Sequence, residues 1–492
     1  MARYRAGGKA SQLAQHSART DGDGNQRRHF KNDREPFALT VFGATIYVVL
    51  TAGDVATVFK RTEALTFDRY VNDIMVQIGL TPEAIAKMWQ HQPSGARKGP
   101  MVPNPGRKPL VHLSEAIFKH QLHPGPQLDE LQDVLLGRMH EVMSWEAMTL
   151  SSRVVLGHQQ QNGRRRVSLL EWIKFAMLEG ATRAFFGGAL LDKVDGGLLD
   201  DFAAFDDQSW KLVYRLPPPW STAMGRSLRR VRASFTRYFE MPMEQRGDAC
   251  WMVRALESEM AAAGIAPPDI AANLFLLYWV INGNAWKLAF WVVAHLAHRP
   301  ALLQTVQGEV RVALAAAAST ADLAARLEGC PATVAVYHEA LRLAASSMGV
   351  RDVVAPVVLS GGRQLRAGAR LLIPFRQMLT DATVWDEQND DSDDDEADSF
   401  DAERFLRSPE LSDAKRNPSF RPFGGGATLC PGRFLAKREV LTCVAQAVGR
   451  FELALADPLA PFPRVEGRMP CLGVMKPVDG DDVTLLVVPR SE

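Results

Sequence analysis

The sequence predicts a mainly helical fold with small β-sheets, an α+β class. Short stretches rich in β-branched residues at 353–373 and 483–488 predict strands. The chain has 492 residues and is 47% hydrophobic, so it is long enough to bury a large core. Apolar residues recur with helical spacing over four longer segments, residues 129–148, 169–186, 271–298 and 301–327.

The N-terminal region changes character near residue 35. Residues 1–35 are rich in Arg, Gln, His, Asp and Gly, so a disordered polar tail is expected. Alternating apolar residues from Leu39 to Leu50, with Gly43 between them, predict a hairpin, and a helix is expected from Asp54 to Lys60. That apolar run falls short of the ~20 residues that span a bilayer. Either the protein is soluble or peripheral to a membrane, or an anchor is missing from this version of the chain.

Two further segments have unusual composition. Prolines between Leu216 and Trp220 separate two helical stretches, and the second, Arg226 to Phe239, is basic on one side. This basic side is either a solvated face or a surface for membrane contact or substrate entry. Residues 386–401 form an acidic low-complexity insert, which predicts a disordered surface loop without a catalytic role.

Charge and cysteine content exclude some classes of protein. The formal net charge of +1 does not favour nucleic acid as a partner. The five cysteines are odd in number, scattered and without metal-site spacing, which indicates a reducing, intracellular compartment and no disulfide framework.

One cysteine stands in a setting suited to holding a metal. A run of glycines follows Phe423, and such a run is needed only where the backbone turns tightly or approaches another group closely. Cys430 comes next, and Pro431 is of the type favoured at the first turn of a helix. The positive end of that helix would favour a thiolate, which is suited to be an axial ligand of haem iron. The alternative is a core cysteine beside a loop.

Two charged motifs precede this cysteine. Glu339 and Arg342 are spaced i, i+3, which places a carboxylate and a guanidinium on one face of a predicted helix. Arg404 follows in the segment before the glycine-rich run. An E-x-x-R pair by itself is common on helix surfaces, but the three elements in this order are more specific.

With these motifs the chain resembles the cytochrome P-450 family. The segment from Phe423 to Gly432 matches the family's F-x-x-G-x-x-x-C-x-G loop, Glu339 and Arg342 match its E-x-x-R pair, and Arg404 matches the third member of that charge triad. The resemblance implies the cytochrome P-450 fold as a single haem domain over residues 36–490, with the triad as a structural element.

The resemblance also implies a cofactor and the residues that bind it. The cofactor is heme b, with iron held by the Cys430 thiolate, an arrangement that favours O–O cleavage in this family. Phe423, Gly424 and Gly426 are then cofactor-binding residues of the loop. Arg351 stands where the family often has a haem-propionate arginine, although an ordinary surface arginine is the competing interpretation.

The segment 271–298 corresponds to the helix that crosses the oxygen-binding side of the haem in this family. Most members carry an acid followed by threonine there, whereas this chain has Gly283 and Asn284, which are the candidate catalytic residues. A pair of this kind followed by Phe-Trp, as in Phe290-Trp291, is similar to the sterol 7-alpha- and 12-alpha-hydroxylases and prostacyclin synthase. Thr428 replaces a common propionate-binding arginine and points to the same branch.

This branch leaves two enzymatic functions open. The first is a monooxygenase that hydroxylates a bulky apolar substrate, sterol-, terpenoid- or polyketide-like, with O₂ and electrons from a separate NADPH-cytochrome reductase, a flavoprotein. Asn284 would then replace threonine in orienting water through its amide. The second is a reductase-independent isomerase of an endoperoxide or hydroperoxide, as in prostacyclin synthase. A haem-binding protein without turnover is a third class.

Partners and substrate contacts follow from the resemblance as well. A reductase implies the cytoplasm or the cytosolic face of the endoplasmic reticulum. Residues 346–354, with Phe275 and Trp279, are expected to form the substrate wall, and core packing is the alternative for the two aromatics. Basic residues on both sides of the cysteine form either a reductase-docking surface or a solvated face. These residues are Lys415, Arg416, Arg421, Arg433, Lys437 and Arg438.

Overall fold

The computed structural model describes residues 34–41, 43–92, 102–149, 152–157, 163–385 and 396–490. The predicted polar tail therefore lies outside the described residues except for Arg34 and Glu35, and most of the predicted acidic loop lies outside them as well. The end of that loop departs from the prediction, because residues 396–398 form a short 3-10 helix, η3 (Glu396–Asp398), and residues 397–401 contact Arg342 and Glu339.

The fold is mainly helical with small sheets, as expected for the α+β class. Two compact units can be distinguished, and each is assembled from segments far apart in the sequence. The sheet unit comprises residues 1–71, 331–430 and 463–481, and the helical unit comprises residues 72–330, 431–462 and 482–492.

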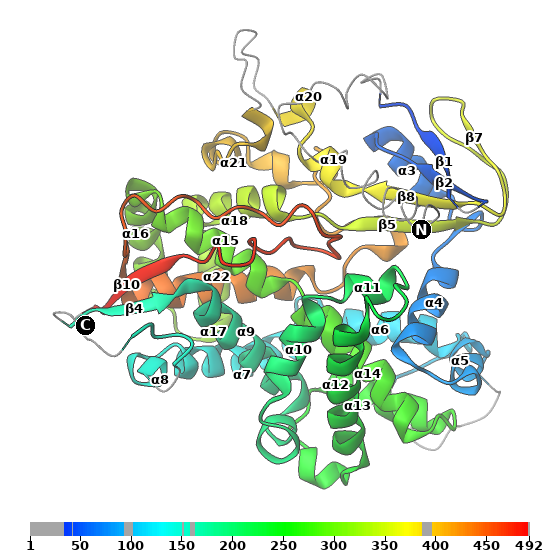
Figure 1. The fold of residues 1–492 in the computed structure, drawn as a ribbon, viewed down its shortest axis with the longest axis horizontal. Coiled ribbons are helices and arrows are strands. Elements are labelled where there is room, and N and C mark those ends of the chain that lie inside the picture. The colour runs from blue at the N-terminus through cyan, green and yellow to red at the C-terminus, as the bar shows by residue number, and fades with distance from the viewer. Residues whose placement is uncertain are drawn as a thin grey trace. The chain divides into compact units, whose positions relative to one another are not determined.

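A five-stranded sheet in the order β1-β2-β8-β5-β3 is the centre of the sheet unit. Figure 1 shows β1, β2, β8 and β5 as neighbouring arrows. β1 and β2 form the predicted hairpin around Gly43, whose φ of +82° only glycine adopts readily. β2 continues the sheet by pairing in parallel with β8, so that Ile46 lies opposite Arg370. The strands are β1 (Phe37–Val41), β2 (Ala44–Val48), β3 (Leu65–Thr66), β5 (Met348–Val353) and β8 (Arg370–Pro374), with a separate pair β6 (Val357–Val358) and β7 (Gln364–Leu365).

Apolar side chains on this sheet pack against the helices of the same unit. Val49, Leu371 and Ile373 are fully buried in this core, together with Val55 and Val58 of the first helix. The helices of the unit are α3 (Ala52–Lys60), α18 (Pro331–Ala344), α19 (Phe375–Leu379), α20 (Ala382–Trp385) and α21 (Glu403–Arg407), with the 3-10 turns η4 (Pro409–Ser412) and η5 (Gly426–Thr428). Helix α4 (Asp68–Ile78) begins at the end of its first segment.

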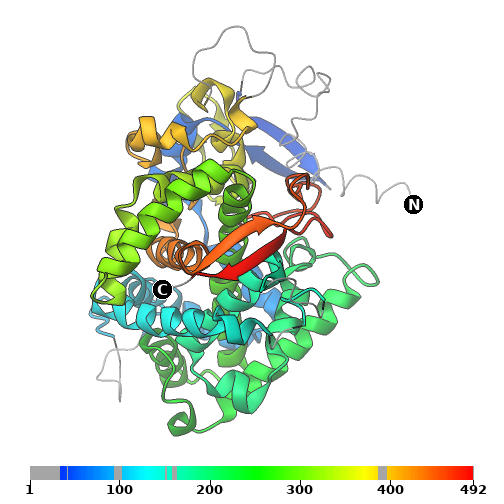
Figure 2. The same cartoon turned by 90° about the vertical axis from the view of Figure 1, so that its left-hand side faces the viewer.

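The helical unit contains the long helices and one three-stranded sheet. Its sheet has the order β4-β10-β9, and Leu485 of β10 lies between Val167 and Leu455. In Figure 2, β9 and β10 run side by side as an orange and a red arrow. Its strands are β4 (Arg165–Ser168), β9 (Phe451–Leu455) and β10 (Thr484–Pro489).

Pairs of long helices make the core of this unit. Helix α7 packs on α9, α12 on α14, and α22 on both α15 and α16. The helices are α5 (Pro82–Trp89), α6 (Leu110–Leu122), α7 (Pro126–Val142), α8 (Trp145–Thr149), α9 (Leu169–Phe186), α10 (Leu198–Asp206), α11 (Trp210–Val213), α12 (Thr222–Glu240), α13 (Trp251–Ala262), α14 (Pro267–Asn282), α15 (Ala285–Ala297), α16 (Pro300–Ala316), α17 (Thr320–Glu328) and α22 (Arg433–Arg450), with the short turns η1 (Leu190–Val194) and η2 (Met243–Arg246).

Three of the four long predicted helices are interrupted, whereas α9 has the predicted bounds. Ser144 separates α7 from α8, and its hydroxyl accepts a hydrogen bond from Ala147 N. Ser319 caps α17 in the same way by accepting from Asp322 N. Serine favours such caps because its hydroxyl binds the free N–H groups of a helix start. The third break, at Gly283 and Asn284, lies in the segment with the candidate catalytic residues.

Within the described ranges, no helix combines the length and the apolar character needed to cross a membrane.

Candidate functional site

The Cys430 loop of the sheet unit turns tightly before the cysteine. Cys430 N donates to Phe423 O at 3.2 Å, which closes the loop, and the turn η5 lies inside it. Gly424 and Gly426 have φ values of +72° and +62°, a region that other residues rarely adopt. Cys430 itself is half-buried. The two glycines therefore have the conformational role that the sequence predicts.

Gly425 is needed for a different reason, which is a close approach to helix α3. A Cβ atom on Gly425 would lie 2.4 Å from Cε2 of Phe59, and one on Gly426 would lie 2.9 Å from the same ring. Both distances are shorter than two heavy atoms tolerate. The Phe59 ring thus packs directly on the loop backbone, and no motif in the sequence indicates this partner.

The helix after the cysteine begins later than predicted. Helix α22 starts at Arg433 with Gly432 at its N-cap, so Pro431 precedes the helix and does not stand in its first turn. Gly432 O accepts the first hydrogen bond of this turn from Ala436 N at 2.8 Å. Cys430 therefore precedes the helix N-terminus by a short link.

Arg351 on β5 is buried beside this loop. Its guanidinium donates to Thr428 Oγ1 and to Val350 O, both at 2.6 Å, and its side chain lies near the rings of Phe59 and Phe67. Arg351 is 5% exposed, and burial lowers the pKa of its guanidinium. No carboxylate pairs with Arg351 in the part of the chain that the structure describes. A buried cation without a carboxylate needs an anionic partner from elsewhere.

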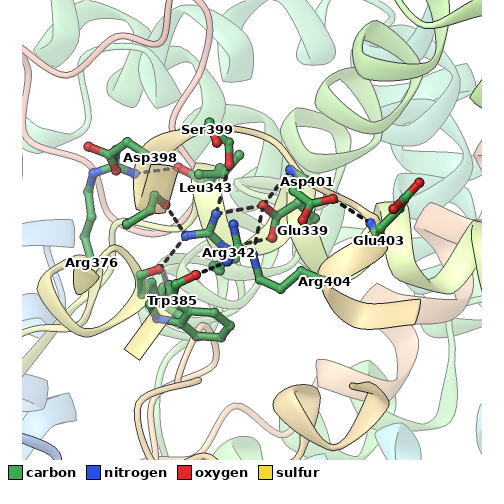
Figure 3. Close-up of polar contacts among 12 residues, drawn as sticks. Glu339, Arg342, Leu343, Arg376, Trp385, Asp398, Ser399, Asp401, Glu403 and Arg404 are labelled. Carbon is green, nitrogen blue, oxygen red and sulfur yellow. Dashed lines mark hydrogen bonds and ion pairs between the residues drawn. The ribbon is translucent and has the colours of Figure 1, made fainter. Parts of the chain in front are cut away.

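Glu339 and Arg342 form a fully buried ion pair on α18, as Figure 3 shows. Arg342 Nε and Nη2 donate to the two oxygens of Glu339, each at 2.7 Å. Arg342 also donates to the carbonyls of Leu379, Ala397 and Ser399. This bidentate geometry, with further acceptors for the guanidinium, satisfies a buried charge pair well.

Arg404 completes this cluster from α21. Its Nε lies 3.8 Å from Glu339 Oε1, which is an ion-pair distance and too long for a hydrogen bond, while Arg404 Nη1 donates to Trp385 O. Asp401 N donates to Glu339 at 3.0 Å. The cluster therefore ties α18 to the segment 379–404, and its backbone partners could not be identified from side-chain motifs.

Gly283 and Asn284 separate two helices of the helical unit. Gly283 is the C-cap of α14, and Asn284, with φ −131° and ψ −44°, precedes α15. A continuous helix was predicted here and is wrong at these two positions. Glycine and asparagine are weak helix formers, because glycine loses much backbone entropy and asparagine competes for backbone hydrogen bonds. The apolar periodicity continues across the break and therefore conceals it.

The aromatics expected in the substrate wall are buried in this unit. Phe275 is fully buried among Phe205 and Phe235, so core packing explains it. Trp279 is 7% exposed, and its Nε1 donates to Asp206 at 3.1 Å. Val280 on the same helix is 62% exposed and was not singled out from the sequence, because one valine in an apolar helix carries no signal.

The six basic residues expected at a docking surface fall into different environments. Arg438 pairs with Asp129 at 2.8 Å, and Lys437 lies 3.6 Å from Glu328. Arg421 is partly buried beside the Phe59 ring, and burial lowers its pKa. Lys415 and Arg416 are exposed.

Comparisons with known proteins agree with these motifs. A family model described as Cytochrome P450 matches residues 287–481. Cytochrome P450 monooxygenase calL of Penicillium decumbens is 26% identical over 442 residues, which cover 84% of this chain and 78% of that protein. The 7-alpha-hydroxycholest-4-en-3-one 12-alpha-hydroxylase of Oryctolagus cuniculus is 27% identical over 298 residues, 56% of each chain.

The match at residues 287–481 assigns this part of the chain to the cytochrome P450 family, and the similar monooxygenases support an oxygenase. Within the superfamily it resembles the branch of the sterol 12-alpha-hydroxylases, although the match covers just over half the length of the rabbit enzyme and of the Sus scrofa enzyme, which is 27% identical.

The residues present fit the haem-thiolate group that membership implies. The glycine backbone leaves no room for side chains beside Phe59, a half-buried cysteine ends the loop, and Arg351 is a buried cation without a carboxylate partner among the described residues. A thiol that can ligate iron and a buried cation that can pair with a carboxylate substituent fit a haem group.

Proposed function

We propose that this protein is a monooxygenase that hydroxylates a bulky apolar substrate, using O₂ and electrons that a separate NADPH-cytochrome reductase supplies. The cysteine loop carries this proposal, because it combines a thiol, a tight glycine backbone and the buried Arg351 in the sheet unit. Heme b, when bound, supplies the iron that activates oxygen. Cys430 would hold this iron through its thiolate.

The neighbours of Cys430 have separate tasks in this proposal. Phe423, Gly424 and Gly426 shape the loop, and their backbone can approach a flat cofactor closely. Arg351 would hold a carboxylate substituent of the cofactor by hydrogen bonds, while Thr428 orients its guanidinium. The buried cluster around Glu339 fixes the segment before the loop and does not contact the reacting atoms.

Asn284 is the proposed catalytic residue on the oxygen-binding side, where the family resemblance assigns it. Its amide can donate and accept hydrogen bonds, so it can hold a water molecule that carries a proton. Gly283 adds no side chain at this position. The backbone of Asn284 is outside the helical region, which turns this residue away from the regular path of α14.

The substrate is inferred to be sterol-, terpenoid- or polyketide-like. Support comes from the resemblance to a hydroxylase of a sterol and to fungal monooxygenases. The exposed Val280 on α14, followed by half-buried Ile281, offers an apolar surface for such a molecule. Residues 348–353 form β5, so the predicted substrate wall on this side is an extended strand.

A reductase would dock through basic side chains that form no ion pair with other described residues of this protein. Lys415 and Arg416 are exposed and have no ion-pair partner among the described residues, in contrast to Lys437 and Arg438. Replacing Lys415 and Arg416 by Gln should slow reduction by an acidic flavoprotein and weaken its salt dependence. Arg366→Gln, at another exposed cation of the same unit, should leave the rate unchanged.

The Cys430→Ala variant tests the proposal directly. The carbon monoxide complex of the wild-type protein should show the red-shifted band of a thiolate ligand, and the variant should lose it. Retention of this band would assign the iron to another residue. Metabolites of cells with and without the protein then separate the reactions, because a monooxygenase adds one oxygen, whereas equal masses would identify the isomerase.

A further inference from the structure

One carboxylate from another helix bridges the break between α14 and α15. Asp206 is the last residue of α10, and its Oδ1 accepts the hydrogen bond from Trp279 Nε1 on α14 at 3.1 Å. Its Oδ2 lies 2.8 Å from Nζ of Lys287 on α15. Trp279 and Lys287 stand on opposite sides of the break. Asp206 therefore binds both helices at once.

This ion pair is partly buried inside the helical unit. The side chains of Lys287 and Asp206 are 13% and 8% exposed, and the ammonium also lies 5.3 Å from the Trp286 ring centroid. A buried ion pair adds little stability compared with apolar side chains of the same size, but it can select one conformation among several. The pair is therefore expected to act on the arrangement of the helices that it joins.

Gly283 lies close to the carboxylate of Asp206. A Cβ atom on Gly283 would lie 3.0 Å from Trp279 O and 3.4 Å from Asp206 Oδ1. The first distance is tighter than nine in ten real Cβ contacts, so a side chain here would require a shift of a few tenths of an ångström, whereas the second is an ordinary van der Waals contact. The carboxylate of Asp206 thus lies against the backbone at the break and would contact a side chain at position 283.

Lys287 connects the carboxylate to Asn284. Its backbone N–H donates to Asn284 O at 3.1 Å, while its Nζ holds Asp206. Leu288 N also donates to Asn284 O, at 3.3 Å. Lys287 is therefore held twice, by Asn284 O through its backbone N–H and by Asp206 through its ammonium. These contacts hold the first turn of α15 and, with it, the backbone of Asn284.

We propose that Asp206 and Lys287 are positioning residues for Asn284. Their ion pair sets the direction in which α15 leaves the break and thereby the direction of the Asn284 amide. This inference deepens the proposed function and rests on it, since it assumes that Asn284 acts near the bound oxygen. It adds a charge requirement from α10 that the motifs of the chain do not contain.

The test compares haem-loaded full-length variants by two measurements. Asp206→Asn and Lys287→Met should increase backbone hydrogen exchange at residues 283–288 by about tenfold or more, because the break opens more readily. They should also shift the C–O stretching frequency of the ferrous carbon monoxide complex, which responds to nearby dipoles and charges. Lys287→Arg keeps the charge and should restore most of the wild-type frequency.

A second buried pair in the same unit provides the control. Arg246 and Glu257 form a bidentate pair at 2.6 and 2.5 Å, with side chains 4% and 11% exposed, and they contact neither Asp206 nor Lys287. Glu257→Gln should lower the thermal midpoint like Asp206→Asn. It should leave both the exchange at 283–288 and the C–O frequency unchanged.

The outcomes separate this inference from the proposed function. Equal effects of Asp206→Asn and Glu257→Gln on all measurements would show a merely structural pair and overturn the inference. If Asp206→Asn does not fold, a wild-type C–O frequency in Lys287→Met overturns it equally well. A wild-type protein without the thiolate-type band would instead contradict the proposed function.

Discussion

The ion pairs Glu339–Arg342 in the sheet unit and Asp206–Lys287 in the helical unit differ in burial and in the elements that they join. Glu339 and Arg342 belong to one helix, are fully buried, and form two parallel hydrogen bonds with three further carbonyl acceptors. Asp206 and Lys287 belong to different helices and share one contact at 2.8 Å.

The two arrangements have different structural consequences. A pair within one helix, with every hydrogen bond satisfied, holds a single arrangement and cannot adjust without leaving charges unpaired. Asp206 on α10 binds one side chain on each side of the break, so its contacts constrain the relative direction of α14 and α15. The first is suited to supporting a loop, and the second is suited to orienting a residue.

Another buried carboxyl, that of Glu439 on α22, lacks a cation among the described residues. It is 5% exposed and has no ion-pair or hydrogen-bond partner in the described ranges, and burial raises its pKa to about 8. Without a nearby cation, burial favours the neutral form of a carboxyl. The carboxylates of the two ion pairs would meet the same desolvation cost if their cations were removed.

The largest effect is expected from Arg342→Met. It leaves Glu339 buried without its bidentate partner and with only the longer ion pair to Arg404, which should cost about 3–5 kcal/mol of unfolding free energy. Arg342→Lys should recover only part of this loss, because an ammonium cannot make the bidentate contact. Denaturant unfolding and haem content measure both variants, and an Arg342→Lys protein as stable as wild type would contradict the comparison.

An intermediate effect is expected when the pair at the break is made apolar. Asp206→Leu alone should cost about 2–4 kcal/mol, whereas Asp206→Leu with Lys287→Met should be close to wild type in stability. A double-mutant cycle measured by thermal unfolding gives the coupling. The double variant should nevertheless keep the altered C–O frequency, so stability and geometry separate.

The smallest effect is a gain, from Glu439→Gln. Between the unfolded pKa of 4.5 and the folded pKa of about 8, the carboxyl is protonated when folded and ionised when unfolded, so unfolding releases a proton and stability falls as pH rises. Gln removes this penalty and should add on the order of 2 kcal/mol at pH 7. At pH 4 the two proteins should be equally stable, and a gain independent of pH would contradict the assignment.

The elements that could be predicted are those whose sequence pattern lies within one short segment. The Cys430 loop, the Glu339–Arg342 spacing and the hairpin at Gly43 each depend on residues within one short segment. Asp206 could not be found, because its partners Trp279 and Lys287 are remote in the sequence and nothing in the acidic residue itself indicates them. Lys437 and Arg438 were predicted at the surface, although acidic residues of α7 and α17 neutralise them.

The parallel pairing of β2 with β8 has a consequence for synthesis on the ribosome. Ile46 finds its neighbour Arg370 only after more than three hundred further residues have been made, and Phe59 reaches Gly425 later still. Closing such long loops is slow. The unpaired edge of the hairpin is exposed to aggregation until β8 has been made and pairs with β2. Strands β1 and β2 therefore remain without their partner β8 during most of the synthesis of the chain.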